Sequence, residues 1–428
     1  MLKTKRTYLI PIIGFALIIL IGSFLLNLPV CNRVDMSFRD CLFVATSGIT
    51  TTGITKGILV EQFTFLGQVV LAILMEIGAM GFIIFVSYFW TIKHKKMRMS
   101  DIMIINDNIN GDDYSNIKKH SIFICKYMFR VQAIGILLLL IRFWPLFGFF
   151  KGTWYSIFHV IAAFSNTGFD LFGVDSITMF AEDWYVQLVT ILVMVLGSLG
   201  ILVIEDLKDK KLKFDKLKVQ TKIVLIYSIV LLIVPTFIMK FYEEDLTLLN
   251  SLFMVSSSRS TAFSITNLEV LTFQSKLLLA ILMVIGGGPT STAGGIRIIP
   301  IAILLATVIS TLKGKTETII FWKKIPDVTI RRAMTIVIVF IISLTFASLI
   351  FYEFNDVGIG RIVFDCISAL SNTGFSIIPK SALNVVGDTI LMVLMFIGRV
   401  GPLSMLMAFV NDDSRTKYIV YPSENIVL

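Results

Sequence analysis

Charged residues are scarce in this sequence: Lys, Arg, Asp and Glu make up 16% of its 428 residues, whereas 56% of the residues are hydrophobic. The mean hydropathy of +0.85 is well above that of a soluble domain and predicts a polytopic membrane protein. The net charge of +9 comes without the interleaved aromatic residues of a nucleic-acid-binding patch. We therefore expect a lipid bilayer around this chain and no nucleic-acid partner.

Histidine and cysteine are also few, which limits metal and enzyme chemistry. His94, His120 and His159 form no HExxH pair, and the chain has no Gly-x-Ser-x-Gly nucleophile elbow. The four cysteines include no CxxC pair of the kind that binds zinc. We expect no enzymatic activity, no cofactor in this chain and four buried thiols, with a Cys31–Cys41 disulfide as the alternative.

A short motif returns four times along the chain. Ser-Asn-Thr-Gly-Phe occurs identically at 165–169 and 371–375, and two further stretches keep small hydroxyl residues at the same places. Such self-similarity at intervals indicates a structure built from repeats. The four stretches are Thr50, Thr51, Thr52 and Gly53; Ser165, Asn166, Thr167 and Gly168; Arg259, Ser260, Thr261 and Ala262; and Ser371, Asn372, Thr373 and Gly374.

Each motif follows an apolar segment of about ten residues, which is too short to cross a bilayer because a spanning helix needs roughly 20 residues. We interpret each copy as a re-entrant helix followed by an extended polar strand that lines a cavity. Four strands indicate one cavity with four walls. The predicted flanking spans are about 7–28 and 62–92, 121–143 and 183–204, 219–241 and 273–311, and 331–352 and 384–410.

The predicted fold is therefore an all-α polytopic membrane protein with eight transmembrane helices and four pore helices. Its repeats of helix, re-entrant loop and helix cover residues 1–98, 117–207, 216–312, where the second helix is broken, and 328–411. Lys and Arg gather before the first span and in the inter-repeat loops near 93–119, 208–218 and 313–332. Because cytoplasmic loops carry the basic excess, we expect a cytoplasmic N-terminus and a cytoplasmic C-terminal tail over 412–428.

The composition of the four strands indicates the transported substrate. Ser, Thr, Asn and Gly offer neutral oxygens, mainly backbone carbonyls, which can replace the hydration shell of a monovalent cation. A ring of carboxylates would instead hold a divalent ion tightly. We predict an ion filter at the sixteen motif residues, with potassium bound there. A helix ending in a capping glycine is the purely structural alternative for a single copy.

Glycines interrupt the apolar stretch 273–311. Low helix propensity predicts an unwound segment there, at about 20 Å from Phe273 along the helix axis. It is no phosphate-binding loop, because no Lys follows the glycines. We predict an intramembrane gate, with a plain kink as the alternative. The gate residues would be Gly286, Gly287, Gly288, Pro289, Thr290, Ser291, Thr292, Ala293, Gly294 and Gly295.

Arg399 lies fifteen residues after Asn384 in the last predicted span, again about 20 Å along the axis. An arginine at membrane depth is costly and faces a cavity or a partner. We assign it to the same gate, where its charge would oppose cation passage. A structural ion pair with Glu76 is the alternative.

With these motifs, the chain resembles the membrane subunit of the Trk/Ktr/HKT superfamily of potassium and sodium transporters, and is most similar to the bacterial Ktr type. The glycine-rich run 286–297 and the stretch 396–402 also carry the likeness, which covers essentially the whole chain. The resemblance implies a pseudo-fourfold pore, a homodimer in the cell membrane, and a cytosolic RCK-type regulatory ring that binds ATP, ADP or another nucleotide. It also implies Gly where this chain has Ala262.

Several functions remain open from the sequence. Potassium uptake across the cytoplasmic membrane is the first prediction, and a sodium-selective or poorly selective transporter of the same fold is the second, because Ala262 departs from the family pattern. An ion-coupled transporter of an organic solute is the third. Such folds usually have two inverted repeats, whereas these four share one orientation.

Overall fold

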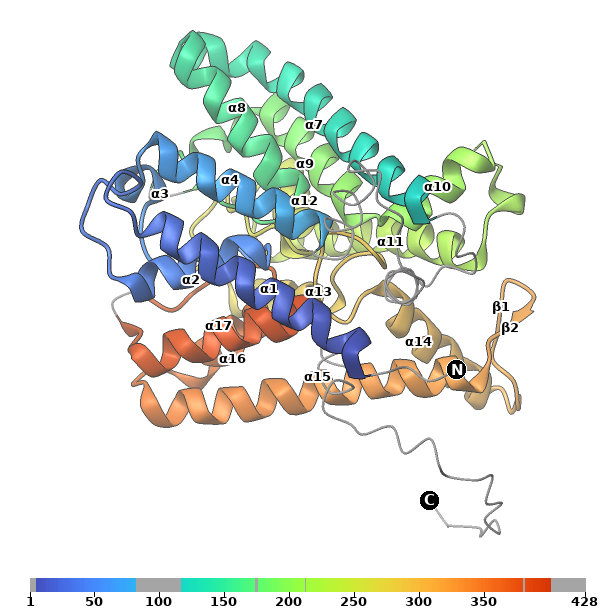
Figure 1. The fold of residues 1–428 in the computed structure, drawn as a ribbon. Coiled ribbons are helices and arrows are strands. Elements are labelled where there is room, and N and C mark those ends of the chain that lie inside the picture. Colours follow the sequence, from blue (N-terminus) through green and yellow to red (C-terminus); the bar gives the residue numbers. More distant parts are fainter. Residues whose placement is uncertain (1–4, 82–116, 174–175, 212, 380–381, 402–428) are drawn as a thin grey trace.

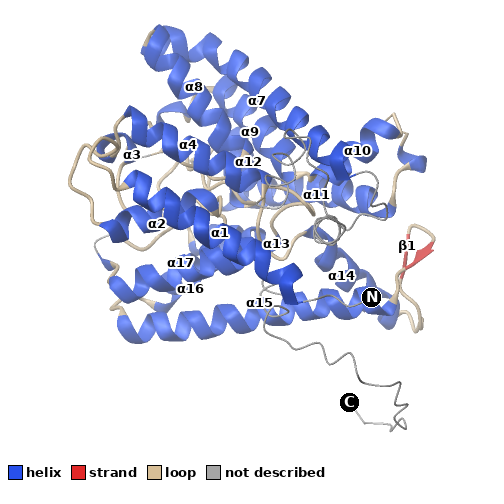
Figure 2. Ribbon diagram, in the orientation of Figure 1, coloured by secondary structure: helices blue, strands red, loops and turns tan. Residues whose placement is uncertain are grey.

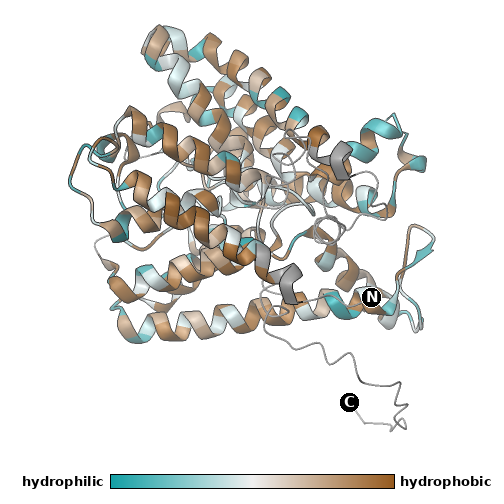
Figure 3. Ribbon diagram, in the orientation of Figure 1, coloured by the Kyte–Doolittle hydropathy of each residue, from teal (hydrophilic) through white to brown (hydrophobic). Residues whose placement is uncertain are grey.

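The computed structural model describes residues 5–81, 117–173, 176–211, 213–379 and 382–401, and the described part is almost entirely helical (Figure 2). One small antiparallel hairpin, β1 (Ile319–Ile320) with β2 (Lys323–Lys324), pairs Ile319 with Lys324. Hydrophobic residues cover most of the long helices, and hydrophilic residues gather near α10 and at the hairpin (Figure 3). The predicted all-α membrane fold is confirmed.

Each repeat begins with a long helix: α1 (Lys5–Leu26), α7 (Ile117–Phe147), α11 (Val219–Tyr242) and α15 (Asp327–Phe354). Among the described helices, Ile122–Phe147 of α7, α11 and α15 are each long and apolar enough to cross a membrane alone. Large apolar side chains such as Leu137, Phe237 and Phe346 are exposed on them, which suits contact with lipid.

The pore helices are short, as expected, at 11 to 16 residues: α2 (Phe38–Ile49), α8 (Phe149–Phe164), α12 (Leu248–Ser258) and α16 (Ile359–Leu370). In α2 and α12, a polar N-cap residue accepts a hydrogen bond from a backbone amide of the first turn: Ser37 from Asp40 and Thr247 from Asn250. The helix α8 follows α7 after only Gly148, whose φ of +78° makes the sharp turn.

The second helix of each repeat is shorter than the predicted span. These helices are α4 (Phe65–Met80), α9 (Trp184–Ser198), α13 (Phe273–Ile285) and α17 (Val385–Val400), with 13 to 16 residues each. At 1.5 Å per residue they cover about 20–24 Å, less than the hydrocarbon core of a bilayer. A side-chain cap starts every one of them, from Thr64, Asp183, Thr272 and Asn384.

A glycine with positive φ ends each second helix: Gly81 (+73°), Gly200 (+92°), Gly286 (+64°) and Gly401 (+94°). A right-handed helix cannot continue through such a residue. The prediction of one continuous span over 183–204 was therefore wrong, because α9 and α10 (Ile201–Asp209) are bent by 91° at this point. Only the break after α13 was anticipated, and the predicted continuations of α4 and α17 lie beyond Gly81 and Gly401, outside the described residues.

The four repeats close into a ring. The second helix of each repeat packs against the pore helix of the next: α4 on α8, α9 on α12, α13 on α16, and α17 on α2. The last of these contacts joins the fourth repeat to the first, so that α17 and α2 lie side by side (Figure 1). Short elements complete the described fold: α3 (Leu59–Gln62), α14 (Ile298–Leu312) and two 3₁₀ turns, Thr178–Phe180 and Phe214–Lys216.

Apolar side chains fill the space between the repeats. Phe143 of α7 is fully buried, and its ring lies 5.4 Å from that of Phe180 and 5.6 Å from that of Phe172. All four cysteines are buried and unpaired, which confirms the expected thiols and excludes the Cys31–Cys41 bridge in this structure.

Candidate functional site

The four motif stretches, called here the predicted filter segments, begin where the four pore helices end. Thr50, Ser165, Arg259 and Ser371 are the C-cap residues of α2, α8, α12 and α16. The other twelve motif residues follow these four, and nearly all sixteen are buried. Because the C-terminus of a helix carries partial negative charge, four helix ends converging on these segments favour a cation among them.

The amide groups of the segments bond back to their own pore helices. The third residue is Thr in every segment, and its N–H donates to Ser47 O in the first repeat (2.8 Å), Ala162 O in the second (2.9 Å) and Ser368 O in the fourth (2.9 Å). These bonds hold the amide side of each segment against its helix. The backbone carbonyls are therefore left for the other side.

The segments are not the simple extended strands that were predicted. Their second residue has positive φ, at +53° in Thr51, +55° in Asn166 and +50° in Asn372, and so does their fourth, at +91° in Gly53 and +74° in Gly168. Residues of negative and positive φ thus alternate along these segments, an arrangement that tends to separate backbone amides from carbonyls. Asn tolerates this conformation, whereas the β-branched Thr51 is a strained exception.

The glycines show that the segments surround one axis. A Cβ atom added to Gly53 would lie 1.8 Å from Thr167 O, one on Gly168 would lie 1.5 Å from Thr261 O, and one on Gly374 would lie 1.9 Å from Thr52 O. Each glycine thus lies against the carbonyl of the next segment in chain order. A capping glycine has no need of such an approach, so these three copies do more than end helices.

The third segment departs from the others. Ala262 has φ +58°, and a Cβ on Gly374 would lie 2.9 Å from the Ala262 methyl group. Ser260 has φ +152°, and the Thr261 N–H donates to Ser257 O four residues back, not five as in the other repeats. The ring of segments is therefore least regular between the third and the fourth repeat.

Side chains of the segments are neutral, with one exception. Hydroxyl groups pair within the first and second segments, Thr50 with Thr52 and Ser165 with Thr167, both at 2.8 Å. The exception is Arg259, whose guanidinium donates to Gly286 O and Ser228 Oγ, outside the ring of segments. Among the described residues, no group of His, Cys, Asp and Glu could hold a metal ion.

The predicted gate lies directly against the predicted filter segments. Its glycine-rich break, Gly286 to Gly295, lies between α13 and α14, and Thr292 is its main contact. The Thr292 hydroxyl accepts a hydrogen bond from Asn166 Nδ2 (2.5 Å), and the Thr292 backbone carbonyl accepts one from Thr51 Oγ1 (3.3 Å). Further along, the Gly294 amide donates to Ser260 Oγ (3.1 Å).

Arg399 joins the same cluster, as the two depth estimates predicted. Its Nη1 donates to Thr292 O (2.7 Å), and its Nη2 donates to Gly78 O at the end of α4. The alternative ion pair with Glu76 is not formed, because Glu76 Oε1 instead accepts from Gln132 Nε2 (2.6 Å). The guanidinium thus connects the fourth repeat, the first repeat and the glycine-rich break.

Sequence reasoning missed the support for the break on its other side. The Gly288 amide donates to Ser198 O (2.8 Å), where α9 bends into α10, and a Cβ on Gly200 would lie 2.2 Å from Pro289 O. The signal was present as Gly-x-x-Gly, which ends the second helix of the first, second and fourth repeats at Gly78, Gly197 and Gly398. Arg297, with φ +75° at the start of α14, was also left out of the predicted gate.

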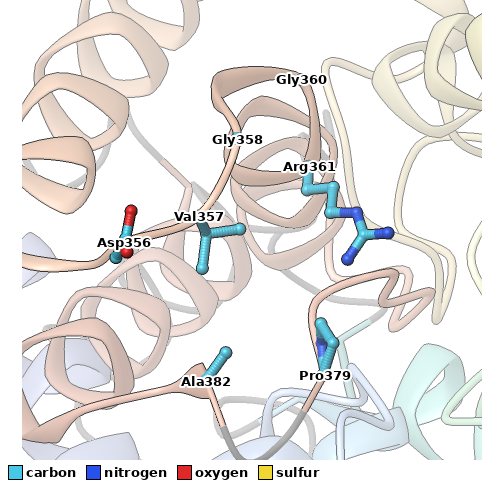
Figure 4. A pocket seen from close by; sticks show the side chains of 7 residues that line it. All are labelled: Asp356, Val357, Gly358, Gly360, Arg361, Pro379 and Ala382. Atoms are coloured by element: carbon cyan, nitrogen blue, oxygen red, sulfur yellow. The ribbon is translucent and has the colours of Figure 1, made fainter.

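Charged side chains also connect the first and fourth repeats beyond the ring. Lys56, three residues after Gly53, binds both Asp40 (2.9 Å) and the fully buried carboxylate of Asp388. Arg39 lies 3.5 Å from the same carboxylate. A pocket of about 380 Å³ lies near this end, lined by Asp356, Arg361 and neighbouring residues (Figure 4), and none of the predicted site residues belongs to it.

Comparisons with known proteins agree with this geometry. The model of the TrkH family, described as cation transport proteins, matches residues 4–418. The chain is 31% identical to the potassium/sodium uptake protein NtpJ of Enterococcus hirae, over 100% of this chain and 99% of that protein. It is 30% identical to the Ktr system potassium uptake protein B of Bacillus subtilis, over 97% and 95% of the two chains.

A solved structure shows the same fold. The potassium transporter TrkH from Vibrio parahaemolyticus matches with a TM-score of 0.74 and 16% identity, over 96% of this chain and 86% of that one. The repeats, the four converging pore helices and these similarities lead to one assignment: the chain belongs to the TrkH family of cation transport proteins.

Proposed function

We propose that this protein takes up potassium across the cell membrane through the ring of the four predicted filter segments. The set of three glycine-to-carbonyl contacts, which join the first segment to the second, the second to the third and the fourth to the first, is the observation that carries the proposal. It leaves room only for backbone atoms between neighbouring segments. Carbonyl oxygens around one axis can replace the water around a monovalent cation, and the helix C-termini behind them favour positive charge.

Sodium transport by the same ring is the second candidate. The irregular third segment, with Ala262 and the unusual φ of Ser260, makes its four walls unequal. Unequal walls weaken selection by ion size, and one relative is named a potassium/sodium uptake protein. Transport of an organic solute lacks comparable support, because both relatives reported above are named for potassium or sodium uptake.

The gate is proposed to be the break Gly286–Gly295 together with Arg399. Support comes from the contacts of Thr292 with Thr51, Asn166 and Arg399, which hold the break beneath the ring. A guanidinium at this place repels an approaching cation. For ions to pass, these bonds have to open.

The orientation of the chain in the membrane is proposed from its charged loops, and its partner subunits are proposed from the names of its relatives. We propose cytoplasmic termini, because the basic loops mark the cytoplasmic side, and repeat limits at 1–98, 117–207, 216–312 and 328–411. Two relatives are named proteins of a Ktr system, which supports partner subunits. A homodimer and a cytosolic RCK-type ring with ATP or ADP are the partners proposed here, and catalysis is not part of the function.

Ion flux into liposomes containing the purified protein tests the proposal. Potassium uptake should be measured by isotope influx, with sodium or an organic solute as competitor and protein-free liposomes as control. We expect isotope influx of potassium. Excess potassium should suppress this influx more than excess sodium does. Equal suppression would favour the sodium or unselective candidate, and no cation influx with a folded protein would refute the function.

A further inference from the structure

The second helix of the third repeat meets its pore helix differently from the other three. In the first, second and fourth repeats a glycine of the second helix lies against the last carbonyl of the pore helix. A Cβ on Gly78 would lie 2.3 Å from Ile49 O, and one on Gly197 or Gly398 would lie 2.2 Å from Phe164 O or Leu370 O. The third repeat has Met283 at this position, and its side chain prevents an equally close approach between the backbones of α13 and α12.

Arg259 bridges the place where that contact is missing. Its Nε donates to Gly286 O (3.4 Å), the residue that ends α13, and its Nη2 donates to Ser228 Oγ of α11 (3.3 Å). The side chains at the same position in the first two repeats bond within their own pore helix and segment: Thr50 to Thr46 O and Thr52, and Ser165 to Ala162 O and Thr167. Among the described residues, this position reaches the end of the second helix only in the third repeat.

Burial of this guanidinium is costly, which argues against an incidental contact. Arg259 is 3% exposed, and the described residues show no carboxylate in an ion pair with it. A buried charge without a counterion is destabilising. The C-termini of two helices, α12 at Arg259 itself and α13 at Gly286, offset part of this cost through their partial negative charge.

The third filter segment is thereby bound to both ends of the break. Arg259 holds the first residue, Gly286, and Ser260 Oγ accepts from the amide of Gly294 near the other end. Ser260 Oγ also donates to Asn372 O of the fourth segment (3.4 Å). A movement of the break therefore pulls on the third segment, and through Ser260 on the fourth.

We propose that Arg259 is a positioning residue that couples the gate to the filter: its guanidinium holds the third filter segment to the start of the break, so that ion selectivity and flux change together. This inference rests on the proposed function. In place of coordinating ions, the Arg259 side chain transmits the position of the break to one wall of the ring.

Arg259→Met tests the coupling, because Met keeps an apolar chain of similar reach and loses both hydrogen bonds. Basal potassium influx into liposomes should rise, and the potassium-to-sodium flux ratio should fall, each by about threefold to tenfold, as expected from losing two long hydrogen bonds of a charged donor. Arg259→Lys should restore part of both. Arg142→Met is the matched control, because Arg142 is half-exposed and pairs with Asp183 away from the ring, and it should change neither quantity.

Two further measurements keep the test decisive. Ser228→Ala removes one partner at little change in volume and should shift flux and ratio in the same directions by a smaller factor, even where Arg259→Met fails to fold. In a variant lacking residues 290–293, Arg259→Met should add no further flux, because coupled residues are not additive. A parent without cation flux would refute the proposed function itself. With an active parent, an unchanged flux ratio in both Arg259→Met and Ser228→Ala, or full additivity with the deletion, would overturn the coupling.

Discussion

Ala262→Gly is the substitution that addresses ion selectivity most directly. Ala262 has φ +58°, a conformation that costs a residue with a Cβ about 1–2 kcal/mol relative to glycine. Its methyl group also stands where the fourth segment would approach the third, 2.9 Å from a Cβ built on Gly374. With glycine at 262, the third segment can adopt the conformation of the other three.

The size of the effect follows from this strain. If the whole relief of about 1.4 kcal/mol appears as a better fit to potassium and none as a better fit to sodium, the selectivity ratio rises by about tenfold. Equal sharing between the two ions leaves the ratio unchanged, so tenfold is an upper bound. We expect a rise of about threefold or more, because four equal carbonyl walls suit one ion size better than unequal ones do.

The assay is potassium and sodium isotope influx into liposomes, measured side by side for the parent and Ala262→Gly. Ala181→Gly is the matched control, since Ala181 has φ −60° and gains nothing from losing its methyl group. A potassium-to-sodium ratio equal to the parent's, with normal folding, would show that the ring already accommodates Ala262 and would refute this reasoning.

The remaining predictions concern the gate, backbone strain, close packing and charge. Arg399→Ala removes two hydrogen bonds to carbonyls and should raise the cation flux measured without any partner subunit. Deleting residues 290–293 should raise this flux more, because the loop also blocks the path sterically. Flux at or below the parent level in both variants would contradict the gate assignment. Thr51→Asn should stabilise the protein by about 1 kcal/mol by relieving a β-branched residue at φ +53°, seen as a higher Tm; an unchanged or lower Tm would contradict it. Gly197→Ala should lower Tm because its Cβ would lie 2.2 Å from Phe164 O, whereas Gly358→Ala meets no atom within 4 Å and should not. Lys56→Met should cost at most about 3–5 kcal/mol, read as a lower Tm, because it takes the nearer of two basic partners from the buried Asp388 and leaves only Arg39. A loss no larger than that of Arg142→Met would show the pair to be unimportant.

Much of the fold was predictable from local pattern. The four motifs, the short pore helices before them and the long apolar stretches around them were all located from sequence to within several residues. The bend between α9 and α10 was missed, because Gly197 and Gly200 lie in a run that is otherwise mostly apolar. The positive φ of Thr51 was also missed, because a β-branched residue disfavours this conformation.

The candidate site was less predictable, since its contacts join distant parts of the chain. The Thr51 side chain bonds to Thr292 across 241 residues, and the Asn372 side chain bonds to Thr52 across 320. Nothing in the neighbourhood of Arg399 or Arg259 indicates which carbonyl each guanidinium reaches. Glu76, the carboxylate at a suitable depth for Arg399, is instead bound to Gln132 on α7.

By itself, the sequence determined the number of repeats, the places where the pore helices end and the neutral chemistry of the filter segments, because hydropathy, glycine and hydroxyl content act within a few residues. Only the tertiary structure decided the order of contacts around the ring, the break lying against the segments and the partners of Arg259 and Arg399. These depend on how closely separate backbones approach. That distance is set by packing of all four repeats together and by no single stretch of chain.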